Sequence, residues 1–565
     1  MSLIGALNIG SSALAAQQAA LQVTGNNISN AGNADYTRQT ATLTTGNDVP
    51  IGGVFLGTGV NLTGVQRQVD EALTARLRSA GSDSQAADTS QQWLTRIEAT
   101  FNALGTTNIS TQMSQFFTSW STLANKPQDM GQRQVVLQSG QGLAQSFNDE
   151  HTQLTSIESD SQQQIASQAT AANGLAQQVA DLNGNIITAE GGGNGQANSL
   201  RDQRDAVLKN LSQLMNVTTI PQANGTVNVY VGSEPLVVAT TNNGVAVSQQ
   251  TVNNQAVSTV VFKSTGAPMK FTSGELSALQ DAQTQAASFT TQLNTLASGM
   301  IFELNKIHAS GQGLAGIDSV TSTNAVADPT AALNSAAAGL PFTPVNGSFV
   351  VHVTNPTTGA DTSTLVKVDL TGTAPGASLN SLAASLNAIS GVTASITGGK
   401  LTIAAASSSV KLGFSQDSSG ALAALGINTF FSGKDASDIA VNATIQNDPT
   451  QIAAAKNGDV ADNQTALAIA ALQTQPLASM NGSSLNDGYQ SMIDGISGQV
   501  ANANTNAQAA TAVNDTLTAQ HDALSGVSLD DEAINLMQQQ RAFQGAARLV
   551  STVDQMMQTL LNMPI

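Results

Sequence analysis

The stretch that decides the architecture is TGNNISNAGNADYTRQTATL, residues Thr24 to Leu43. It follows an amphipathic segment without charged side chains, and it places four asparagines within eight positions before a lone tyrosine. Asparagine amides can satisfy the carbonyl groups that a helix leaves free at its end. We therefore interpret the stretch as the point where a helix gives way to a turn. The amides of Asn26, Asn27 and Asn30 would bond either helix-end carbonyls or a neighbouring subunit.

The segment before this turn repeats an apolar side chain every seven residues, at Leu7, Leu14, Leu21 and Ile28. An apolar seam with this spacing is typical of a helix that packs against a coiled-coil-like partner. The sequence therefore predicts an N-terminal seam helix that ends near the asparagine-rich turn.

The C-terminal segment carries a second seam. Ser528 and Asp531 have the spacing of a capping box, which predicts that a helix begins there. Beyond them two heptad positions are apolar, one at Leu529, Leu536, Phe543, Val550 and Met557, the other at Ala546, Val553 and Leu560. Two ordinary core helices would show the same spacing. Seams at both ends of one chain nevertheless favour pairing of the ends with each other or with neighbouring subunits.

The composition narrows the classes of function. The 565-residue chain has a formal net charge of −18 and a pI of about 4.4, which argues against binding to nucleic acid or to an anionic membrane surface. Cysteine is absent, which excludes disulfides, thiol catalysis and cysteine metal sites. No apolar run approaches the roughly 20 residues of a membrane helix. No lysine or arginine precedes Arg38, so we expect export, if it occurs, to proceed without cleavage of a secretory signal.

Between the two seams the hydrophobic periodicity changes. Residues 70–214 follow a helical pattern, whereas 217–270 alternate in short segments separated by glycine and asparagine, as strands do. Thr272 is expected to cap the next helix, which runs to about His308. Short strand-like segments return after Gly311.

The predicted fold class is therefore α+β and multidomain, with a nested arrangement in which the N- and C-terminal helices meet in a coiled-coil-like layer. The expected parts are a terminal helical assembly domain (1–43 with 528–565), a helical rod domain (44–216 with 272–312 and 459–527), a small β-domain (217–271) and an inserted β-rich domain (313–458).

The residues that could support catalysis form no known constellation. The four histidines, His151, His308, His352 and His521, share no short spacing, and the HExxH, GxSxG and GxxxxGK[ST] motifs are absent. The acidic run at 530–532 is explained by the first turn of a helix, where carboxylates interact favourably with the helix dipole. We expect no enzyme, no cofactor and no metal site, with an unrecognised carboxylate site in the inserted domain as the remaining alternative.

Both ends of the sequence resemble the terminal segments shared by bacterial flagellar axial proteins, the family of rod, hook and hook-associated proteins. At the N-terminus the resemblance rests on AAQQAAL at Ala15–Leu21, TGNNISNA at Thr24–Ala31 and YTRQ at Tyr36–Gln39. At the C-terminus it rests on SLDDE at Ser528–Glu532, followed by NL, QQRAF, AAR and DQMM. The family commonly has Pro-Gly just before the tyrosine, and this chain has Ala34-Asp35 instead.

Within the family, YTRQ, SLDDE and the segment SGELSALQDA at Ser273–Ala282 look most like the hook-associated proteins of the hook–filament junction. The resemblance implies a structural adaptor that polymerises into a helical tube through its terminal helices, with its β-rich domains facing outward. It implies export through the flagellar type III apparatus to the extracellular flagellum. The implied partners are further copies of the chain, hook protein, the third hook-associated protein and an export chaperone that holds the C-terminal helix, with no nucleic acid and no membrane.

The resemblance and the seams together define an expected assembly interface. It comprises Leu7, Leu14, Leu21, Asn26, Asn27, Ile28, Asn30, Tyr36, Arg38, Leu536, Phe543, Val550, Val553, Met557 and Leu560. Because isolated helices are marginal in water, residues 1–40 and 530–565 are expected to be mobile in the monomer and ordered in the polymer.

Two alternatives use some of the same features. Another axial protein, such as hook protein or a flagellin-like protein, would share the terminal helices. Flagellin, however, lacks the asparagine-rich YTRQ segment, and hook protein is not expected to carry the helical region 70–214. An acidic secreted adhesin would use the β-domains within 217–458 to bind ligands, but it would leave the two terminal seams unexplained.

Overall fold

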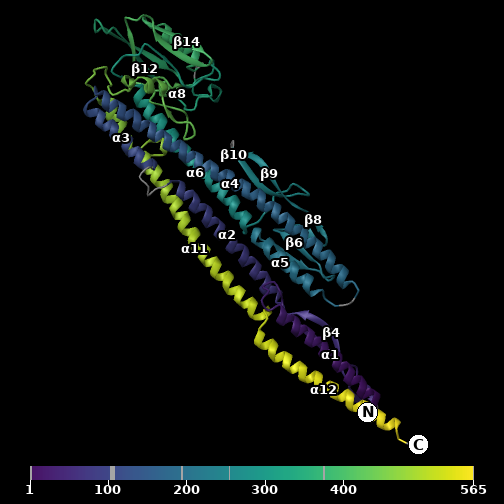
Figure 1. The fold of residues 1–565 in the computed structure, drawn as a ribbon. Helices are drawn as coiled ribbons and strands as arrows, with labels where there is room; N and C mark the ends of the chain where they lie inside the picture. Colours follow the sequence, from purple (N-terminus) through teal and green to yellow (C-terminus); the bar gives the residue numbers. More distant parts are fainter. Residues whose placement is uncertain are drawn as a thin grey trace. The chain divides into compact units, whose positions relative to one another are not determined.

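The computed structural model describes residues 3–51, 53–101, 108–192, 195–252, 255–372 and 376–563. Long helices dominate these residues, and small antiparallel sheets are attached to them (Figure 1). The multidomain α+β fold class predicted from the sequence is confirmed.

The helices are named in chain order. They are α1 (Leu3–Ser29), α2 (Glu71–Phe101), α3 (Ile109–Asn125), α4 (Met130–Glu190), α5 (Asn198–Leu214), α6 (Glu275–Ala309), α7 (Leu379–Asn387), α8 (Ala421–Leu425), α9 (Ala443–Asn447), α10 (Gln464–Ala471), α11 (Leu485–Ser525) and α12 (Leu529–Leu561).

The chain divides into two compact units. The first consists of Met1–Trp93, Asp160–Gln283 and Ala501–Ile565, and the second of Leu94–Ser159 and Thr284–Val500. Helices α2, α4, α6 and α11 contribute residues to both units, so the division falls inside regular helices. The four-part division made from the sequence follows the type of secondary structure, and its boundaries stay a prediction.

In the first unit, α1 is followed by a long hairpin. β1 (Gln39–Thr45) pairs antiparallel with β4 (Val60–Arg67), and between them β2 (Val49–Ile51) pairs with β3 (Val54–Leu56). Ser12 of α1 accepts a hydrogen bond on Oγ from the N–H of the first residue of β4 at 3.4 Å. The hairpin therefore covers one face of α1.

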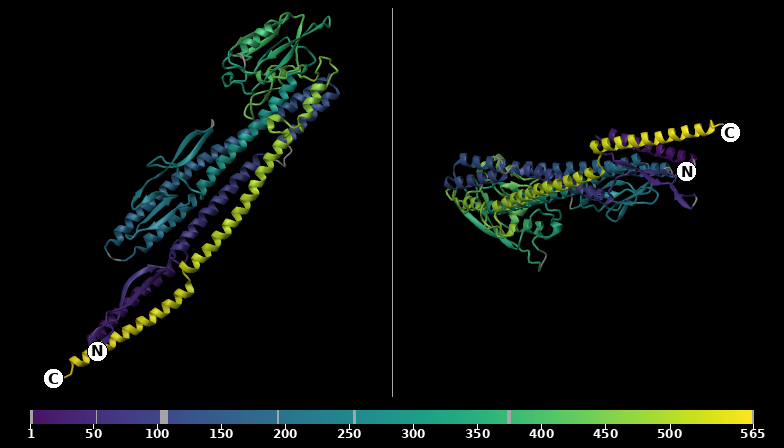
Figure 2. Two further views of the ribbon diagram at one scale, coloured as in Figure 1. Left: turned by 180° about the vertical axis from the view of Figure 1, so that it is seen from behind. Right: turned by 90° about the horizontal axis from the view of Figure 1, so that it is seen from below.

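The C-terminal helix α12 lies beside α1 in the same unit (Figures 1 and 2). It begins after Ser528, whose Oγ accepts a hydrogen bond from the N–H of Asp531 at 3.3 Å, as the sequence predicts. Within the single chain, the two ends thus pair with each other.

The strands of 218–262 also belong to the first unit. They are β5 (Thr218–Pro221), β6 (Val227–Val231), β7 (Glu234–Val238) and β8 (Thr241–Asn242), which form one sheet in that order, and the hairpin of β9 (Val245–Val252) with β10 (Gln255–Phe262). Along β6, every second side chain is buried, which is the period expected of a strand with one face in a core. Val229 and Val237 share that core with Leu208 of α5 and Leu279 of α6.

The predicted cap at Thr272 is wrong. The helix α6 begins at Glu275, directly after Gly274, whose φ of +92° lies in the left-handed region. A Cβ on Gly274 would lie 2.6 Å from the backbone of Met215, so the two chain segments approach closely there. Thr272 instead donates its N–H to Asn216 Oδ1 at 3.0 Å, and it accepts on Oγ1 from Asn216 Nδ2 at 3.3 Å. This long-range contact overrides the local capping signal.

The inserted β-rich domain belongs to the second unit and contains two three-stranded sheets, with orders β13-β12-β16 and β11-β15-β14. The strands of this part of the chain are β11 (Ser319–Thr321), β12 (Gly347–Thr354), β13 (Asp361–Val368), β14 (Val392–Thr397), β15 (Lys400–Ala405), β16 (Lys411–Ser415), β17 (Phe431–Ser432) and β18 (Ala440–Val441). Helix α7, with a capping box at Ser378, packs against β14. Phe349, Phe414 and Leu401 lie in the common core and are fully buried.

Candidate assembly interface

The turn after α1 is held by the side chain of Asn27, which is 1% exposed. Its Nδ2 donates to the carbonyl oxygen of Gln39 at 2.9 Å, and its Oδ1 accepts from the N–H of Gln39 at 3.0 Å. The amide thus bonds both backbone polar groups of Gln39, as the backbone of a neighbouring strand does in a sheet. The Tyr36 hydroxyl donates to the same Oδ1 at 2.8 Å. Burial, together with the Asp202 and Glu532 carboxylates nearby, raises the pKa of Tyr36 to about 12. Asn27 therefore fixes the direction in which the chain leaves α1.

Other asparagines close the turn itself. Asn30 donates from Nδ2 to the carbonyl oxygen of Asn26 at 2.9 Å, and its N–H donates to the same oxygen at 3.1 Å. Asn33 Oδ1 accepts from the N–H of Asp35 at 3.1 Å, and Asn33 O accepts from the N–H of Tyr36 at 3.1 Å. An asparagine that bonds the backbone two residues on is typical of a tight turn. Of the two roles that the sequence left open, Asn30 takes the one within its own chain.

Arg38 connects the turn to the start of α12. Its Nε donates to Glu532 Oε1 at 2.8 Å, and the Glu532 side chain is 2% exposed. The N–H of Arg38 donates to the carbonyl oxygen of Ser525, the last residue of α11, at 2.9 Å. The helix dipole alone explains a carboxylate in the first turn of α12. A buried carboxylate also needs a partner, and Arg38 supplies it across the contact between the two chain ends.

Small and polar side chains, rather than the predicted leucine line, form the buried face of α1. The buried residues are Gly10, Ala16, Ala20, Thr24 and Asn27. The line of Leu7, Leu14, Leu21 and Ile28 is only partly buried. The expectation that the leucine line packs on the other chain end or on a neighbouring subunit therefore stays a prediction. Because the hairpin and α12 both pack on α1, the helix turns its small residues toward them and leaves the leucine line at the border.

The contact between α1 and α12 is close. A Cβ on Gly10 would lie 2.7 Å from Val550 Cγ2, so only a residue without a side chain fits there without a shift. Further along, Thr24 Oγ1 donates to Gln539 Oε1 at 3.0 Å. The two helices thus meet where the Val550 side chain packs on Gly10 and again where Thr24 and Gln539 form a polar pair.

Helix α12 divides its apolar residues between two faces. Of the predicted seam, Ala546 and Val553 are buried, Leu536, Phe543, Val550 and Met557 are partly buried, and Leu529 and Leu560 are 56% and 63% exposed. Outside the seam, the residues Ile534, Met537, Leu549 and Met556 share one side of the helix and are between 41% and 53% exposed. We call these four residues the outer apolar face of α12. Apolar side chains gathered on one exposed helix indicate a surface that another protein covers.

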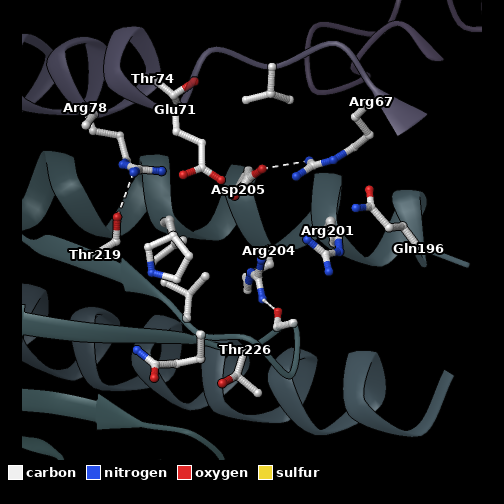
Figure 3. Close-up of a pocket in the computed structure, with 17 residues that line it drawn as sticks. Arg67, Glu71, Thr74, Arg78, Gln196, Arg201, Arg204, Asp205, Thr219 and Thr226 are labelled. Carbon is white, nitrogen blue, oxygen red and sulfur yellow. Dashed lines mark hydrogen bonds and ion pairs between the residues drawn. The ribbon is translucent and has the colours of Figure 1, made fainter. Parts of the chain in front are cut away.

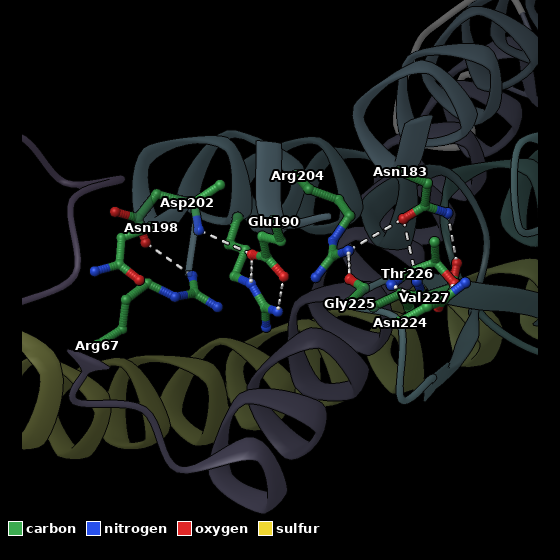
Figure 4. Close-up of polar contacts among 12 residues, drawn as sticks. Arg67, Asn183, Glu190, Asn198, Asp202, Arg204, Asn224, Gly225, Thr226 and Val227 are labelled. Atoms are coloured by element: carbon green, nitrogen blue, oxygen red, sulfur yellow. Dashed lines mark hydrogen bonds and ion pairs between the residues drawn. The ribbon is translucent and has the colours of Figure 1, made fainter. Parts of the chain in front are cut away.

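A polar network that the sequence did not reveal ties the hairpin to α5 (Figure 4). Arg67 at the end of β4 donates from Nη1 to Asp202 Oδ1 at 2.8 Å and to Asp205 Oδ2 at 2.7 Å. Asn198 Nδ2 donates to the carbonyl oxygen of Val65 at 3.0 Å. Arg67 and Asp202 stand 135 positions apart, so no local pattern could have paired them.

A serine–histidine–aspartate arrangement occurs in the inserted β-rich domain. His352 Nδ1 lies 3.0 Å from Asp361 Oδ2, and His352 Nε2 lies 2.7 Å from Ser415 Oγ, the order of contacts found in serine hydrolases. Ser415, however, is 4% exposed within strand β16. The three side chains form a cross-strand bridge over β12, β13 and β16.

Metal-ligand clusters and membrane-spanning helices are both absent from the residues that the structure describes. Among these residues, no three or more histidines, aspartates or glutamates converge as the ligands of a metal ion would. No described helix combines the length and the apolar character that a bilayer crossing requires.

Family models match both ends and the middle of the sequence. "Flagellar hook-associated protein FlgK helical domain" matches residues 94–321, "Flagella basal body rod protein" matches 7–32, and "Flagellar basal body rod FlgEFG protein C-terminal" matches 520–563. The two end matches coincide with α1 and with the end of α11 followed by α12. The segments that form the contact between the chain ends are thus those that the chain shares with rod proteins.

The similar whole proteins are flagellar hook-associated proteins as well. Flagellar hook-associated protein 1 of Escherichia coli (strain K12) is 26% identical over 577 residues, covering 98% of this chain and 99% of that protein. Its counterpart in Salmonella typhimurium is 34% identical over 226 residues, 40% of each chain. The solved flagellar hook junction protein FlgK from Burkholderia pseudomallei shares the fold, with a TM-score of 0.50 and 17% identity over 79% of this chain and 99% of that one. Over nearly its whole length, the chain is thus similar to flagellar hook-associated protein 1.

Proposed function

We propose that this chain, a flagellar axial protein of the hook–filament junction, polymerises through its paired terminal helices and so joins hook to filament. The outer apolar face of α12 is the observation that carries this mechanism. α12 is fixed to the turn after α1 by the Arg38–Glu532 ion pair and to α1 by the close contact at Gly10, and it still exposes large apolar side chains. Subunits that pack around a common axis would bury such a face.

The proposed interface joins the border of α1 to the outer apolar face of α12. The partly buried line of Leu7, Leu14, Leu21 and Ile28 would complete its burial against a neighbouring copy. Asn27 and Tyr36 would act from within the subunit by holding the turn, while Leu560 would contact the neighbour directly. Assembly of this kind requires no catalytic step.

We assign the remaining contacts to three classes of partner. Hook protein would lie on one side of the assembled subunits, and the third hook-associated protein on the other. Before export, a chaperone would cover α12, because exposed apolar side chains on a free subunit invite aggregation. Residues 1–40 and 530–565 remain expected to be mobile in the free monomer, and limited proteolysis of dilute monomer would test this.

A pair of substitutions on the outer apolar face tests the mechanism. Leu549 and Met556 lie one heptad apart and are 41% and 52% exposed, so changing both to Asp should leave the monomer folded. We expect cells with L549D/M556D to carry hooks without filaments and to shed flagellin, as seen by electron microscopy. The control is Leu365→Asp on strand β13, a residue that is 56% exposed in the inserted domain. Normal filaments in the double variant would contradict the proposal.

Deletion of residues 1–40 separates this function from that of a secreted adhesin. A junction protein without α1 should fail to assemble, whereas an adhesin would still bind its ligand through the β-domains. Retained binding to a surface together with normal filaments would favour the adhesin.

A further inference from the structure

Arginine side chains converge on a polar cavity in the first unit. The cavity has a volume of about 270 Å³ and is lined by α2, α5 and the strands β5 and β6 with their connecting turn (Figure 3). Its lining includes the four guanidinium groups of Arg67, Arg78, Arg201 and Arg204 but only two carboxylates, those of Glu71 and Asp205. With Asp202 and Glu190, which bind two of these arginines from outside the lining, four carboxylates stand beside the four guanidinium groups.

Two of these arginines are already neutralised. Arg67 binds Asp205 at 2.7 Å and Asp202, which lies behind the cavity wall, at 2.8 Å. Arg201 binds Glu190 through two hydrogen bonds of 2.8 Å, the two-point geometry that guanidinium and carboxylate groups favour. Three of the four nearby carboxylates are therefore committed to these two residues.

The other two arginines have only neutral acceptors. Arg204 is 3% exposed, and its Nη1 donates to Asn183 Oδ1 at 3.1 Å and to Gly225 O at 2.7 Å. Its Nε is buried without a hydrogen-bond partner among the described residues. Arg78 donates from Nη2 to Thr219 Oγ1 at 2.8 Å, and no described carboxylate lies within ion-pair distance of it. Burial lowers the pKa of both guanidinium groups, that of Arg204 to about 10.

Nearby carboxylates, Asp205 among them, act on both charges, but neither guanidinium group has a carboxylate in hydrogen-bond contact among the described residues. An anion in the cavity whose oxygens accept from the N–H groups of the two guanidinium groups would supply such a contact. Arginine is well suited to this task because its planar donors match the oxygens of carboxylate and phosphate groups. We propose that this cavity is a binding site for an oxyanion, held by Arg78 and Arg204.

The oxyanion could be a free ion or the acidic side chain of another copy of the chain, since both present the same oxygens. A free ion would occupy the site in the monomer and would not interfere with polymerisation. A carboxylate from a neighbouring copy would enter only in the polymer, where free phosphate would compete with it. The monomer measurement below needs no polymer, so its failure is distinct from a failure of the proposed assembly.

Inorganic phosphate is the probe for the full-length monomer, titrated against chloride at constant ionic strength and pH. We expect the unfolding temperature of the first unit to rise saturably with phosphate, by about 2–4 °C when phosphate is tens of times above its dissociation constant. Arg78→Gln should abolish most of this rise. Arg76→Gln is the matched control, because Arg76 lies on the same helix but is exposed and does not line the cavity.

Three outcomes decide the proposal. A rise in the wild type and in Arg76→Gln that is lost in Arg78→Gln supports the site. In that case, slower polymerisation of the wild type in phosphate assigns the natural anion to a neighbouring copy, and an unchanged rate assigns it to a free ion. The proposal is overturned if phosphate acts no differently from chloride, or if Arg78→Gln keeps the full rise.

Discussion

The core of the inserted β-rich domain and the contact between α1 and α12 bury opposite kinds of side chain. In the inserted domain, large apolar residues such as Phe349 and Phe414 are fully buried. In the contact between the chain ends, the buried residues are small or polar, among them Gly10, Ala546 and Glu532, while large apolar residues such as Leu561 remain exposed. The inserted domain buries its large apolar side chains in its own core. The terminal pair leaves many of its large apolar side chains exposed, where other molecules can contact them.

This difference has an energetic consequence. Full burial of a large apolar side chain contributes about 1.5–3 kcal/mol, so the inserted domain gains most of its stability within one chain. The stability of the terminal pair should instead depend on protein concentration, because binding to other copies adds to it by mass action.

The largest effect is expected in the inserted domain. Phe349→Ala removes a fully buried ring from β12 and should lower the free energy of unfolding by about 3–5 kcal/mol. Leu365→Ala on the neighbouring strand β13, at a residue that is 56% exposed, should change it by less than about 0.5 kcal/mol. Chemical denaturation of the two variants measures both. A small effect of Phe349→Ala would mean that burial of large apolar side chains contributes little to the stability of this domain.

The next-largest expected effect is a pH dependence of the free energy of unfolding. It arises at His308 in the second unit. The ring is completely buried: Nδ1 lies 2.8 Å from Asn428 O and therefore donates to it, while Nε2 accepts from the N–H of Ala453 at 3.0 Å. Burial, with the charge of Arg133 as a smaller cause, lowers the pKa of His308 from 6.5 to about 4. The unfolded chain therefore binds a proton more readily than the folded one between these values.

The contribution of His308 to the free energy of unfolding is complete above pH 6.5. It is lost as the pH falls from 6.5 toward 4, and the total loss is up to about 3 kcal/mol. His308→Gln should remove this part of the pH dependence, while His521→Gln on α11 should leave it unchanged. Denaturation at several pH values between 4 and 8 measures the slope. An identical slope in His308→Gln would show that another group titrates.

The sequence predicted the class of elements well where a local period determines them. The seven-residue spacing from Leu536 to Met557 predicted α12, and Ser528 predicted its start. The same spacing predicted α1 but not its orientation. A heptad shows which residues share a face, and it does not show that a hairpin would compete with α12 for the same helix. Within the single chain, the buried face of α1 therefore contains Gly10 and Thr24, and the packing of the leucine line against another copy stays a prediction.

The contacts that fix the site were less accessible from sequence. The pairing of Arg38 with Glu532 joins residues 494 positions apart, and such a pair leaves no local signal. The sequence indicates that the amide of Asn27 forms hydrogen bonds near the end of the helix. Its bonds to Gln39 and Tyr36, however, depend on the path of the turn. The sequence thus indicated the segment that matters, while the packing assigned the role of each residue.

A smaller effect is expected from the ion pair between the chain ends. Arg38→Gln leaves the carboxylate of Glu532, which is 2% exposed, without its charged partner, and should destabilise the start of α12 by about 2 kcal/mol. Glu532→Gln and the double variant complete a double-mutant cycle, whose coupling energy isolates the pair. Hydrogen exchange of α12 amides in the monomer measures each step. A coupling energy near zero would mean that the turn and α12 are held together by other contacts.

The smallest effect compares two glycines of α1. A Cβ on Gly10 would lie 2.7 Å from Val550 Cγ2, whereas one on Gly25 would meet nothing within 4 Å. In a helix, alanine is more favourable than glycine by about 0.5–1 kcal/mol, so Gly25→Ala should stabilise α1 by that amount. Gly10→Ala has the same intrinsic gain but must push α12 away, and we expect a net loss of about 1 kcal/mol. Hydrogen exchange of α1 should therefore slow in one variant and quicken in the other. Slower exchange in both would show that α12 yields freely, and that the pair is less closely packed than the contact at Gly10 indicates.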